Sequence, residues 1–392
     1  MFLLVCTMAV MSLHAQLPTV LIYNPERLAT IKKNIQQKDQ NSVTMLSALL
    51  QQADSMLAMK PVSVMDKAFT PESGNKHDYM SQAPYFWYDS SKPNGRPYLR
   101  RDGERNPEIY KITDRTYLGK LDNACRVLSL AWYFTGNEKY AAKASGLLQT
   151  WFIDEATKMN PNLNFGQAVP GINSGRGIGI IETISLTGIV DAAGLLAGSK
   201  AWTKADDETV KKWYAQYLDW MLTSKNGREE HAAKNNHGTW YYAQVIDFAL
   251  FTGDKQKAKQ LAEESKKRLD SQLTREGKQP LELERTNGLG YSTMNLRGWF
   301  TVSTLAEKTG VDLWNYKTSQ TISLRTAFDW LIPYALGEKK WEYQQISKYN
   351  KDDIYPLLLQ AADKYKDDRY LRYSNEMNKE DHDPITALLY GR

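Results

Sequence analysis

Cysteine is scarce in this chain, which holds only Cys6 and Cys125 among its 392 residues. Glycine (24 residues) and proline (14 residues) are not abundant, and no long run of basic residues occurs. The composition is that of a globular protein, and these shortages argue against a disulfide-rich scaffold and a basic nucleic-acid-binding tail. The 50 basic and 45 acidic residues leave a formal net charge of +5, which is too small to indicate nucleic acid and is compatible with an anionic substrate.

The signatures of several enzyme classes are missing as well. The chain contains no GxGxxG, Walker, HExxH, GxSxG or CxxC motif, which argues against nucleotide-binding, zinc and serine-hydrolase sites. Its five histidines are scattered and do not form a metal-binding motif. We therefore expect neither a metal nor an organic cofactor.

The first residues, MFLLVCTMAVMSLHAQ, are typical of a secretory signal peptide, although a positively charged start is missing. Their apolar stretch is too short to span a bilayer, and Ala15 offers a small residue for cleavage. A lipoprotein anchored at Cys6 is the alternative. We predict a signal peptide over residues 1–15 and an exported protein, periplasmic or extracellular, with no membrane segment after cleavage.

Residues 16–392 are expected to form a single domain, since no break in composition divides them. Cys125 is interpreted as a buried thiol rather than a nucleophile. Apolar residues recur at helical spacing with short breaks between segments, and strand-like alternation is scarce. The pattern predicts an all-α fold, a ring or barrel of antiparallel helix hairpins. A monomer is expected, although the sequence leaves the oligomeric state open. The predicted helices cover 24–59 (as one or two helices), 117–134, 138–152, 176–197, 204–225, 236–251, 255–274, 291–309, 320–337 and 351–366.

Aromatic residues are plentiful: the chain has 11 Trp, 23 Tyr and 10 Phe. Many lie between Pro61 and about Arg115, where prolines and glycines interrupt the helical pattern, as in a functional loop. Rings interleaved with arginines suit a polymer of sugar acids, because rings stack on sugar faces and guanidinium groups pair with carboxylates. The alternative is that the rings only fix the loop to the helices beneath. The substrate-binding candidates here are Tyr85, Trp87, Tyr88, Arg96, Arg100 and Arg101.

Asn236 and His237 stand at the predicted start of a helix, in KNNHGTWYYAQ. Exposed backbone N–H groups and the positive end of the helix dipole favour a negative ligand there, and both side chains add donors. Trp240 and Tyr241 are further candidates for substrate contact. The alternative is an asparagine that caps the helix while His237 packs.

Arg285 and Tyr291 lie on either side of two glycines in QPLELERTNGLGYS. An arginine holds a carboxylate through two parallel hydrogen bonds, and a tyrosine acts as a base if nearby positive charge lowers its pKa from about 10. The alternative pairs Arg285 with a neighbouring glutamate and packs Tyr291 in the core.

A polar loop, NPNLNFGQAVPG, precedes the segment GRGIGIIE. Its amides and the following arginine either line a cleft or satisfy the backbone of a turn, and the two interpretations stay open. The substrate-binding candidates are Asn164, Gln167 and Arg176.

Taken in order, these clusters resemble the alginate lyase superfamily, the helical-toroid polysaccharide lyases that include families 5 and 38. The resemblance runs from about residue 78 to 307 and implies an incomplete ring of helix hairpins around a groove. It matches Asn236 and His237 to the family's Asn-His pair, Arg285 to its arginine and Tyr291 to its catalytic tyrosine. Ser292 stands where family 5 enzymes often carry a histidine, which favours the glucuronan and alginate lyases of family 38.

The resemblance implies β-elimination of a (1→4)-linked uronate polymer: alginate, polymannuronate or polyglucuronate. Asn236, His237 and Arg285 would neutralise the carboxylate beside the scissile bond, since charge stabilisation is usually the largest catalytic effect. Tyr291 would take the C5 proton and then protonate the departing O4. In guluronate, where proton and leaving oxygen lie on opposite faces, His237 would take the proton instead. The positive cluster is also expected to lower the pKa of Tyr291.

Two other functions stay open at this point. An inverting glycoside hydrolase would need two carboxylates roughly 6.5–9.5 Å apart across the cleft, with Glu182, Asp247 and Glu282 as candidates. A periplasmic glycan-binding protein would use the same rings and arginines without turnover.

Overall fold

The computed structural model describes residues 17–319, 321–377 and 384–390. The predicted signal peptide and Cys6 lie outside the described residues, so both interpretations of the N-terminus stay predictions. The α-helices are α1 (Pro25–Gln36), α2 (Gln40–Met56), α3 (Asp114–Thr135), α4 (Glu138–Phe152), α5 (Leu186–Leu196), α6 (Lys204–Thr223), α7 (Lys225–Ala232), α8 (Asn236–Phe251), α9 (Lys255–Gln272), α10 (Pro280–Leu283), α11 (Gly288–Glu307), α12 (Leu324–Leu336), α13 (Tyr355–Tyr365), α14 (Arg369–Glu376) and α15 (Pro384–Tyr390).

The break between α3 and α4 shows how the sequence sets these boundaries. Gly136 adopts a left-handed conformation (φ 66°) and its N–H bonds back to the carbonyl of Trp132, which ends α3. The side chain of Asn137 then accepts from the backbone N–H of Lys139 and caps α4. One helix therefore turns directly into the next, and the two pack as a hairpin.

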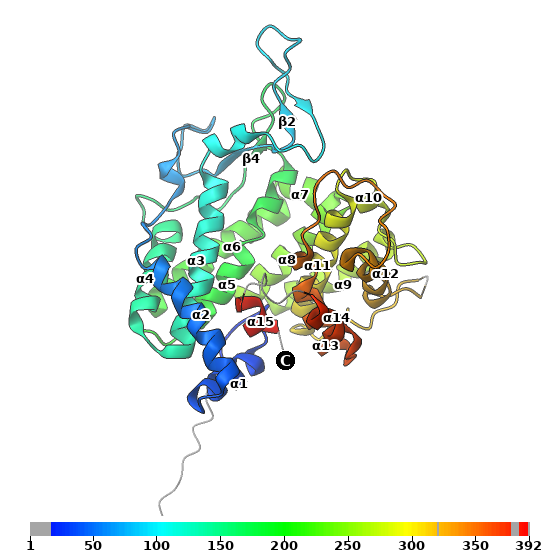
Figure 1. Cartoon of the computed structure of the whole chain (residues 1–392). Coiled ribbons are helices and arrows are strands. Elements are labelled where there is room, and N and C mark those ends of the chain that lie inside the picture. The colour runs from blue at the N-terminus through cyan, green and yellow to red at the C-terminus, as the bar shows by residue number, and fades with distance from the viewer. Residues whose placement is uncertain (1–16, 320, 378–383, 391–392) are drawn as a thin grey trace, which may run out of the picture.

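The helices form the expected ring of hairpins, and the predicted all-α class is confirmed (Figure 1). Helix α3 packs on α5, α5 on α8 and α8 on α11, while α4, α6, α9 and α12 pack on the outside of this series. The inner helices α8 and α11 are buried along most of their length. Helix α15 packs on both α2 and α13, so it joins the last hairpin to the first near the bottom of Figure 1.

The loop from Pro61 to Arg115 is irregular, as predicted, and carries three short strands and two 3₁₀ turns. Strand β1 (Met80–Gln82) pairs in parallel with β4 (Phe165–Ala168), and β2 (Phe86–Trp87) pairs antiparallel with β3 (Leu99–Arg100). The 3₁₀ turns are η1 (Val64–Asp66) and η2 (Pro107–Lys111). The β2–β3 hairpin projects from the top of the ring, above α7 and α10 (Figure 1).

The expected helix over 176–197 is instead two elements. Residues Gly177–Thr183 form the 3₁₀ helix η3, and α5 follows it. Gly177 lies so close to α7 that a Cβ would stand 2.6 Å from the carbonyl oxygen of Asn226, so this tight approach requires glycine. The stretch Gly177–Leu196 is apolar and long enough to span a membrane, but 61% of its most apolar window is buried inside the protein. It is a core segment.

Two further differences concern the second half of the chain. Helices α7, α10, α14 and α15 were not predicted, and the 351–366 segment begins as the 3₁₀ turn η4 (Lys351–Asp353) before α13. These elements are eight residues long or shorter, about two turns or less, which is too short for a helical period to be recognised. Cys125 is fully buried, and burial raises the pKa of its thiol, which matches its interpretation as a packed thiol.

Candidate active site

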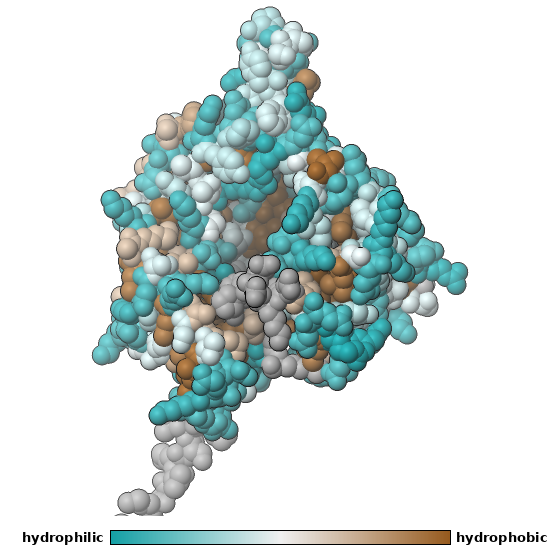
Figure 2. Space-filling view, viewed as in Figure 1, coloured by the Kyte–Doolittle hydropathy of each residue, from teal (hydrophilic) through white to brown (hydrophobic). Residues whose placement is uncertain are grey.

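The face of the ring below the β2–β3 hairpin is hollowed, with a largely hydrophilic rim (Figure 2). Two groups of residues meet at this end of the ring, and all of them except Asp102 were predicted from the sequence. The helix wall consists of residues at the start of α8, just after α10 and in the first turn of α11: Asn236, His237, Arg285 and Tyr291. The loop wall consists of residues from the long loop and from β4 to η3: Tyr85, Trp87, Arg100, Asp102, Gln167 and Arg176.

Tyr291 is the point at which the two walls touch. Its hydroxyl lies 2.8 Å from Nη2 of Arg285 and 2.9 Å from the hydroxyl of Tyr85. The guanidinium carbon of Arg285 also stands 3.8 Å from the centre of the Tyr291 ring. The phenolic oxygen therefore has a cationic donor and a second hydroxyl as neighbours, which suits a group that exchanges a proton.

The pKa of Tyr291 differs from the sequence-based expectation. Burial raises it above its usual value, and neighbouring Tyr85 raises it further, while Arg285 acts in the opposite direction. The expected lowering by positive charge is thus outweighed by desolvation. The free protein consequently holds Tyr291 in its protonated form at neutral pH.

Arg285 is held by Asp102, a residue that was not predicted from the sequence. Its Nε donates to Oδ2 of Asp102 at 3.0 Å and its Nη2 donates to Oδ1 at 2.7 Å. Asp102 also accepts from the hydroxyl of Thr286 at 3.1 Å and from Arg100 at 2.8 Å. Although burial opposes it, hydrogen bonding to Arg285 keeps the pKa of Asp102 well below its usual range. The expected partners of the alternative, Glu282 and Glu284, do not form this ion pair.

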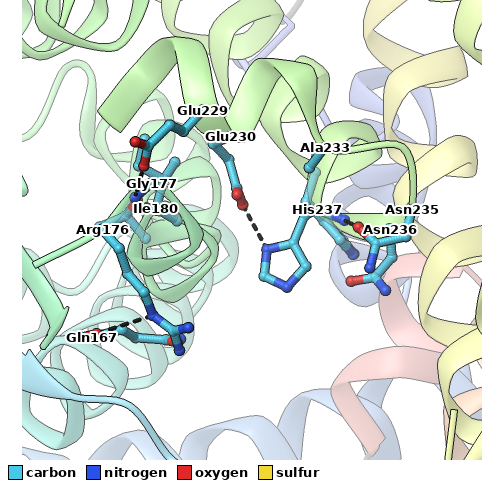
Figure 3. Close-up of polar contacts among 12 residues, drawn as sticks. Gln167, Arg176, Gly177, Ile180, Glu229, Glu230, Ala233, Asn235, Asn236 and His237 are labelled. Carbon is cyan, nitrogen blue, oxygen red and sulfur yellow. Dashed lines mark hydrogen bonds and ion pairs between the residues drawn. The ribbon is translucent and has the colours of Figure 1, made fainter. Parts of the chain in front are cut away.

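His237 projects from the first turn of α8. Its Nδ1 lies 2.8 Å from Oε1 of Glu230, whose side chain is buried at the end of α7. A carboxylate at Nδ1 makes that nitrogen the donor and leaves Nε2 as the acceptor available to a ligand. In Figure 3 the imidazole points away from α8, toward the open space that Arg176 also faces.

Asn236 lies beside His237 at the start of α8, and its side chain is buried. Its backbone N–H donates to Oε1 of Glu282 at 2.6 Å and its Nδ2 donates to Oε2 at 2.7 Å. Helix α8 is capped instead by Asn235, whose side chain accepts from the N–H of His237. Within the described residues, Oδ1 of Asn236 has no hydrogen-bond partner, and the predicted contact of Asn236 with a substrate carboxylate stays a prediction.

Arg176 and Gln167 stand opposite His237 in the close-up (Figure 3). Arg176 donates from Nε to the backbone carbonyl of Gln167 at 3.1 Å and from Nη2 to its Oε1 at 3.0 Å. Its guanidinium also lies 5.0 Å from the ring centre of Phe86. Gln167 is buried with a positive φ of 50°, so it orients Arg176 rather than reaching into the hollow.

The remaining loop candidates lie further out. Trp87 donates from its indole to the carbonyl of Glu104 and carries the guanidinium of Arg101 at 5.4 Å over its ring. Tyr88 is 52% exposed, and Arg96, Arg100, Arg101 and Asn164 are also exposed. Asn164 accepts from the indole of Trp220 at 3.0 Å. These residues are free to meet a ligand, although only Arg100 contacts the Asp102 site.

Two candidates are placed where they cannot bind substrate. Trp240 and Tyr241 are each 3% exposed, and the hydroxyl of Tyr241 donates to the carbonyl of Met221. Both rings belong to the core between α6, α8 and α11. Their aromatic character and their position after His237 made them candidates, but an inner helix is buried on nearly all sides, so neither presents a ring to the hollow.

The carboxylates that a hydrolase would need are not available either. Asp247 and Glu282 are buried residues, and the side chain of Glu182 is buried as well. Glu182 accepts from Tyr79 and Ser81, and Glu282 is bonded to Asn236. Burial raises the pKa of Asp247 well above its usual value. None of the three faces open solvent across a cleft, so the structure does not support that alternative. Within the described ranges, no group of three His, Cys, Asp or Glu side chains is arranged to hold a metal ion.

The site residues missed from the sequence are carboxylates. Asp102 lies 183 positions from Arg285, and Glu230 contacts His237 across the turn between two helices. In the sequence, the one indication that Asp102 belongs to the site is its position next to the predicted residues Arg100 and Arg101, in RRDG. A long-range ion pair has no sequence period and becomes visible in the folded chain alone.

Fold and site together define a class: a ring of helix hairpins that brings a tyrosine, an arginine and a histidine to one hollow, as the sequence resemblance to helical-toroid polysaccharide lyases implied. The family model described as alginate lyase matches residues 63–341. The chain belongs to the alginate lyase family and is a polysaccharide lyase.

Solved structures agree with this assignment. The chain is similar to an alginate lyase from Bacteroides ovatus, with 40% identity and a TM-score of 0.91, covering 95% of this chain and 99% of that one. It also shares its fold with alginate lyase A1-III from Sphingomonas species A1, at 17% identity and a TM-score of 0.60, covering 95% and 97% of the two chains. The H192A variant of A1-III, solved with a tetrasaccharide, has a TM-score of 0.61 at 16% identity and covers 95% of this chain and 98% of its own. No match was found among curated proteins.

Proposed function

We propose that this lyase cleaves alginate, or the related uronate polymer glucuronan, by β-elimination in the hollow between the helix wall and the loop wall. The observation that carries the proposal is the place of the Tyr291 hydroxyl, 2.8 Å from Arg285 and 2.9 Å from Tyr85. The similar Bacteroides ovatus protein is described as an alginate lyase, and A1-III has been solved with a tetrasaccharide, which supports an anionic polysaccharide as substrate.

The reaction breaks the C5–H and C4–O4 bonds of one uronate and forms a C4–C5 double bond. The proton leaves C5 to a base, and the departing O4 takes a proton from an acid. The difficulty is the second negative charge that develops beside a carboxylate, so donors that neutralise the carboxylate matter most. Arg285 and Arg176 are the cations that face this reaction, and His237 adds an imidazole.

The protonation of Tyr291 assigns the roles. Because burial raises its pKa, Tyr291 enters the reaction with a proton that it can give to O4. Nε2 of His237, left free by the Glu230 contact, can take the C5 proton when it lies on the opposite face, as in guluronate. In mannuronate and glucuronate both groups lie on one face, so Tyr291 must first ionise and Arg285 stabilises its phenolate.

Export and oligomeric state complete the proposal. We propose that the predicted signal peptide directs the mature chain to the periplasm or outside the cell, where it would meet a polymer that is too large to enter the cell. A monomer is the proposed working unit, because the hollow is built from residues of one chain.

The test is ultraviolet absorbance during incubation with polymannuronate, polyguluronate and polyglucuronate, with chelator present. An unsaturated uronate absorbs, so a rise on one polymer identifies both elimination and substrate. New saturated reducing ends without absorbance would indicate a hydrolase, and binding without either product would indicate a glycan-binding protein. Either result would overturn the proposal.

A further inference from the structure

A cavity adjoins Tyr291 on the side of the ring interior. Its volume is about 290 Å³, close to the lower end of the ~300–1,000 Å³ typical of small-molecule sites. Tyr85 and Tyr291, whose hydroxyls are hydrogen-bonded to each other, form one end of the cavity. Arg297 and Asp353 form the other end. The lining residues are Tyr85, Asn287, Gly290, Tyr291, Thr293, Met294, Arg297 and Asp353.

The cavity follows one face of α11. Residues 287, 290, 294 and 297 are spaced three or four apart, so they share a stripe along the helix. Arg297 lies six residues after Tyr291, which is about 9 Å further along the helix axis. A polymer that places its scissile bond at Tyr291 therefore passes Arg297 with a neighbouring sugar unit.

Arg297 is the uncommitted cation of this region. The guanidinium of Arg285 is tied to Asp102 and that of Arg176 to Gln167. Within the described residues, the Arg297 side chain makes no hydrogen bond or salt bridge. Its charge acts on the Asp353 carboxyl, and its guanidinium carbon stands 5.7 Å from the ring centre of Trp240. Its side chain is exposed although it lies in the middle of a helix with buried neighbours. A free guanidinium in a concave wall is ready to bind a carboxylate through two hydrogen bonds.

Space and polarity suit a sugar unit. A Cβ added at Gly290 would have no atom within 4 Å, so the cavity is open above this turn of α11. By contrast, a Cβ at Gly288 would already touch Leu283 and Trp341. Asp353, the last residue of η4, lines the opposite side of the cavity and is half-buried. Its carboxyl group can accept hydrogen bonds from sugar hydroxyls.

We infer that this cavity is a subsite for a uronate unit next to the cleaved one, with Arg297 binding its carboxylate. The inference rests on the proposed function, since it takes a uronate polymer as the ligand. It assigns a direction to the bound chain, which runs from Arg176 and His237 past Tyr291 to Arg297. Arg297 is a specificity-determining residue here, and it takes no part in the proton transfers.

The experiment compares wild type with Arg297→Ala, Arg297→Lys and the exposed control Arg275→Ala on the polymer that wild type cleaves best. Loss of a charge-assisted hydrogen bond should raise KM about tenfold to a hundredfold for Arg297→Ala, with kcat changed much less. Arg297→Lys should fall between, because an ammonium keeps the charge without the planar fork. Arg275→Ala should match wild type. Wild-type kinetics in Arg297→Ala would overturn the inference.

A second variant tests the space without touching the charge. Gly290→Met should fill the cavity from a position where a side chain meets no atom, and should raise KM at an unchanged melting temperature. An unchanged KM would also overturn the inference.

If wild type releases no unsaturated uronate from any polymer, the proposed function fails on its own. Affinity electrophoresis in gels containing polymannuronate then decides the subsite. Weaker retardation of Arg297→Ala than of Arg275→Ala supports a carboxylate site, and equal retardation rejects it.

Discussion

The two walls of the hollow are built differently. On the helix wall, His237 and Asn236 are each backed by a buried carboxylate, Glu230 and Glu282, so their positions are fixed from behind. On the loop wall, Tyr85, Trp87 and Arg176 are half-buried and Arg100 is exposed, and the side chains of Trp87 and Arg176 donate to backbone carbonyls of the same loops. Rigid elements hold a catalytic geometry more accurately than loops do. The difference therefore suggests that the helix wall performs the chemistry while the loop wall grips the polymer.

Two contacts cross between the walls and complicate this division. Tyr85 forms a hydrogen bond with Tyr291, and Asp102 forms an ion pair with Arg285. The loop therefore helps to hold the reacting groups. The following predictions separate a gripping role from a catalytic one.

The largest effect is expected for Tyr291→Phe, which removes the exchangeable proton and keeps the ring. Turnover should fall by about 10²–10⁴-fold, the usual contribution of a general acid or base. Affinity for the polymer in a binding assay should stay close to that of wild type. Full activity in this variant would remove Tyr291 from the mechanism.

Asp102→Asn should come next, although it lies on the loop wall. Without the carboxylate, Arg285 loses its two-point support, and misplacement of a catalytic group costs up to about a hundredfold. We expect kcat to fall about tenfold to a hundredfold. Glu104→Gln, an exposed carboxylate of the same loop, serves as the control, and equal kinetics in the two variants would show that the loop only grips.

The pH profile should distinguish the polymers. Since burial raises the pKa of Tyr291, activity on polymannuronate or polyglucuronate should keep rising into the alkaline range as the phenol ionises. Activity on polyguluronate, which uses protonated Tyr291 as the acid, should level off or decline there. Parallel profiles on both kinds of polymer would contradict the assigned roles.

Trp87→Ala should have a small effect that is confined to binding. An exposed ring–ligand contact is worth ~0.5–1 kcal/mol, which corresponds to about a two- to fivefold rise in KM. Turnover at saturation should not change. Tyr110→Ala, which removes another exposed ring of this loop, is the matched control.

The smallest effect on activity is expected at Asp247, which lies in the core rather than in either wall. Burial raises its folded-state pKa, so the stability of the neutral acid is present at low pH and is lost as pH rises through that pKa. Asp247→Asn should therefore lose fewer degrees of melting temperature than wild type as the pH rises from about 4 toward neutrality. Identical slopes would show that Asp247 does not titrate in this range.

The fold was largely predictable from the sequence because helical periodicity and caps are local. The turn at Gly136 and Asn137 places the ends of α3 and α4 within a few residues of the expectation. Tyr291, Arg285 and His237 were found through a resemblance, and they do converge at one hollow. The burial of individual rings could not be predicted. Trp240 and Tyr241 were expected to bind substrate, yet they face the core because α8 is an inner helix. The partners Asp102 and Glu230 were not predicted, because no local sequence pattern indicates which distant residues pair in the folded chain.

The beginning of the described chain carries a practical consequence. The Asp191 carboxylate accepts the backbone N–H groups of Leu21, Ile22 and Tyr23, and Gly194 lies against the carbonyl of Thr19. Burial raises the pKa of Asp191 to about 6, so these three donors offset much of the cost of hiding it. A recombinant chain that starts after Tyr23 would lack these three donors and would leave the buried Asp191 carboxyl group without them. Expression and tagging should therefore begin upstream of Thr19, with the tag best joined through a flexible spacer.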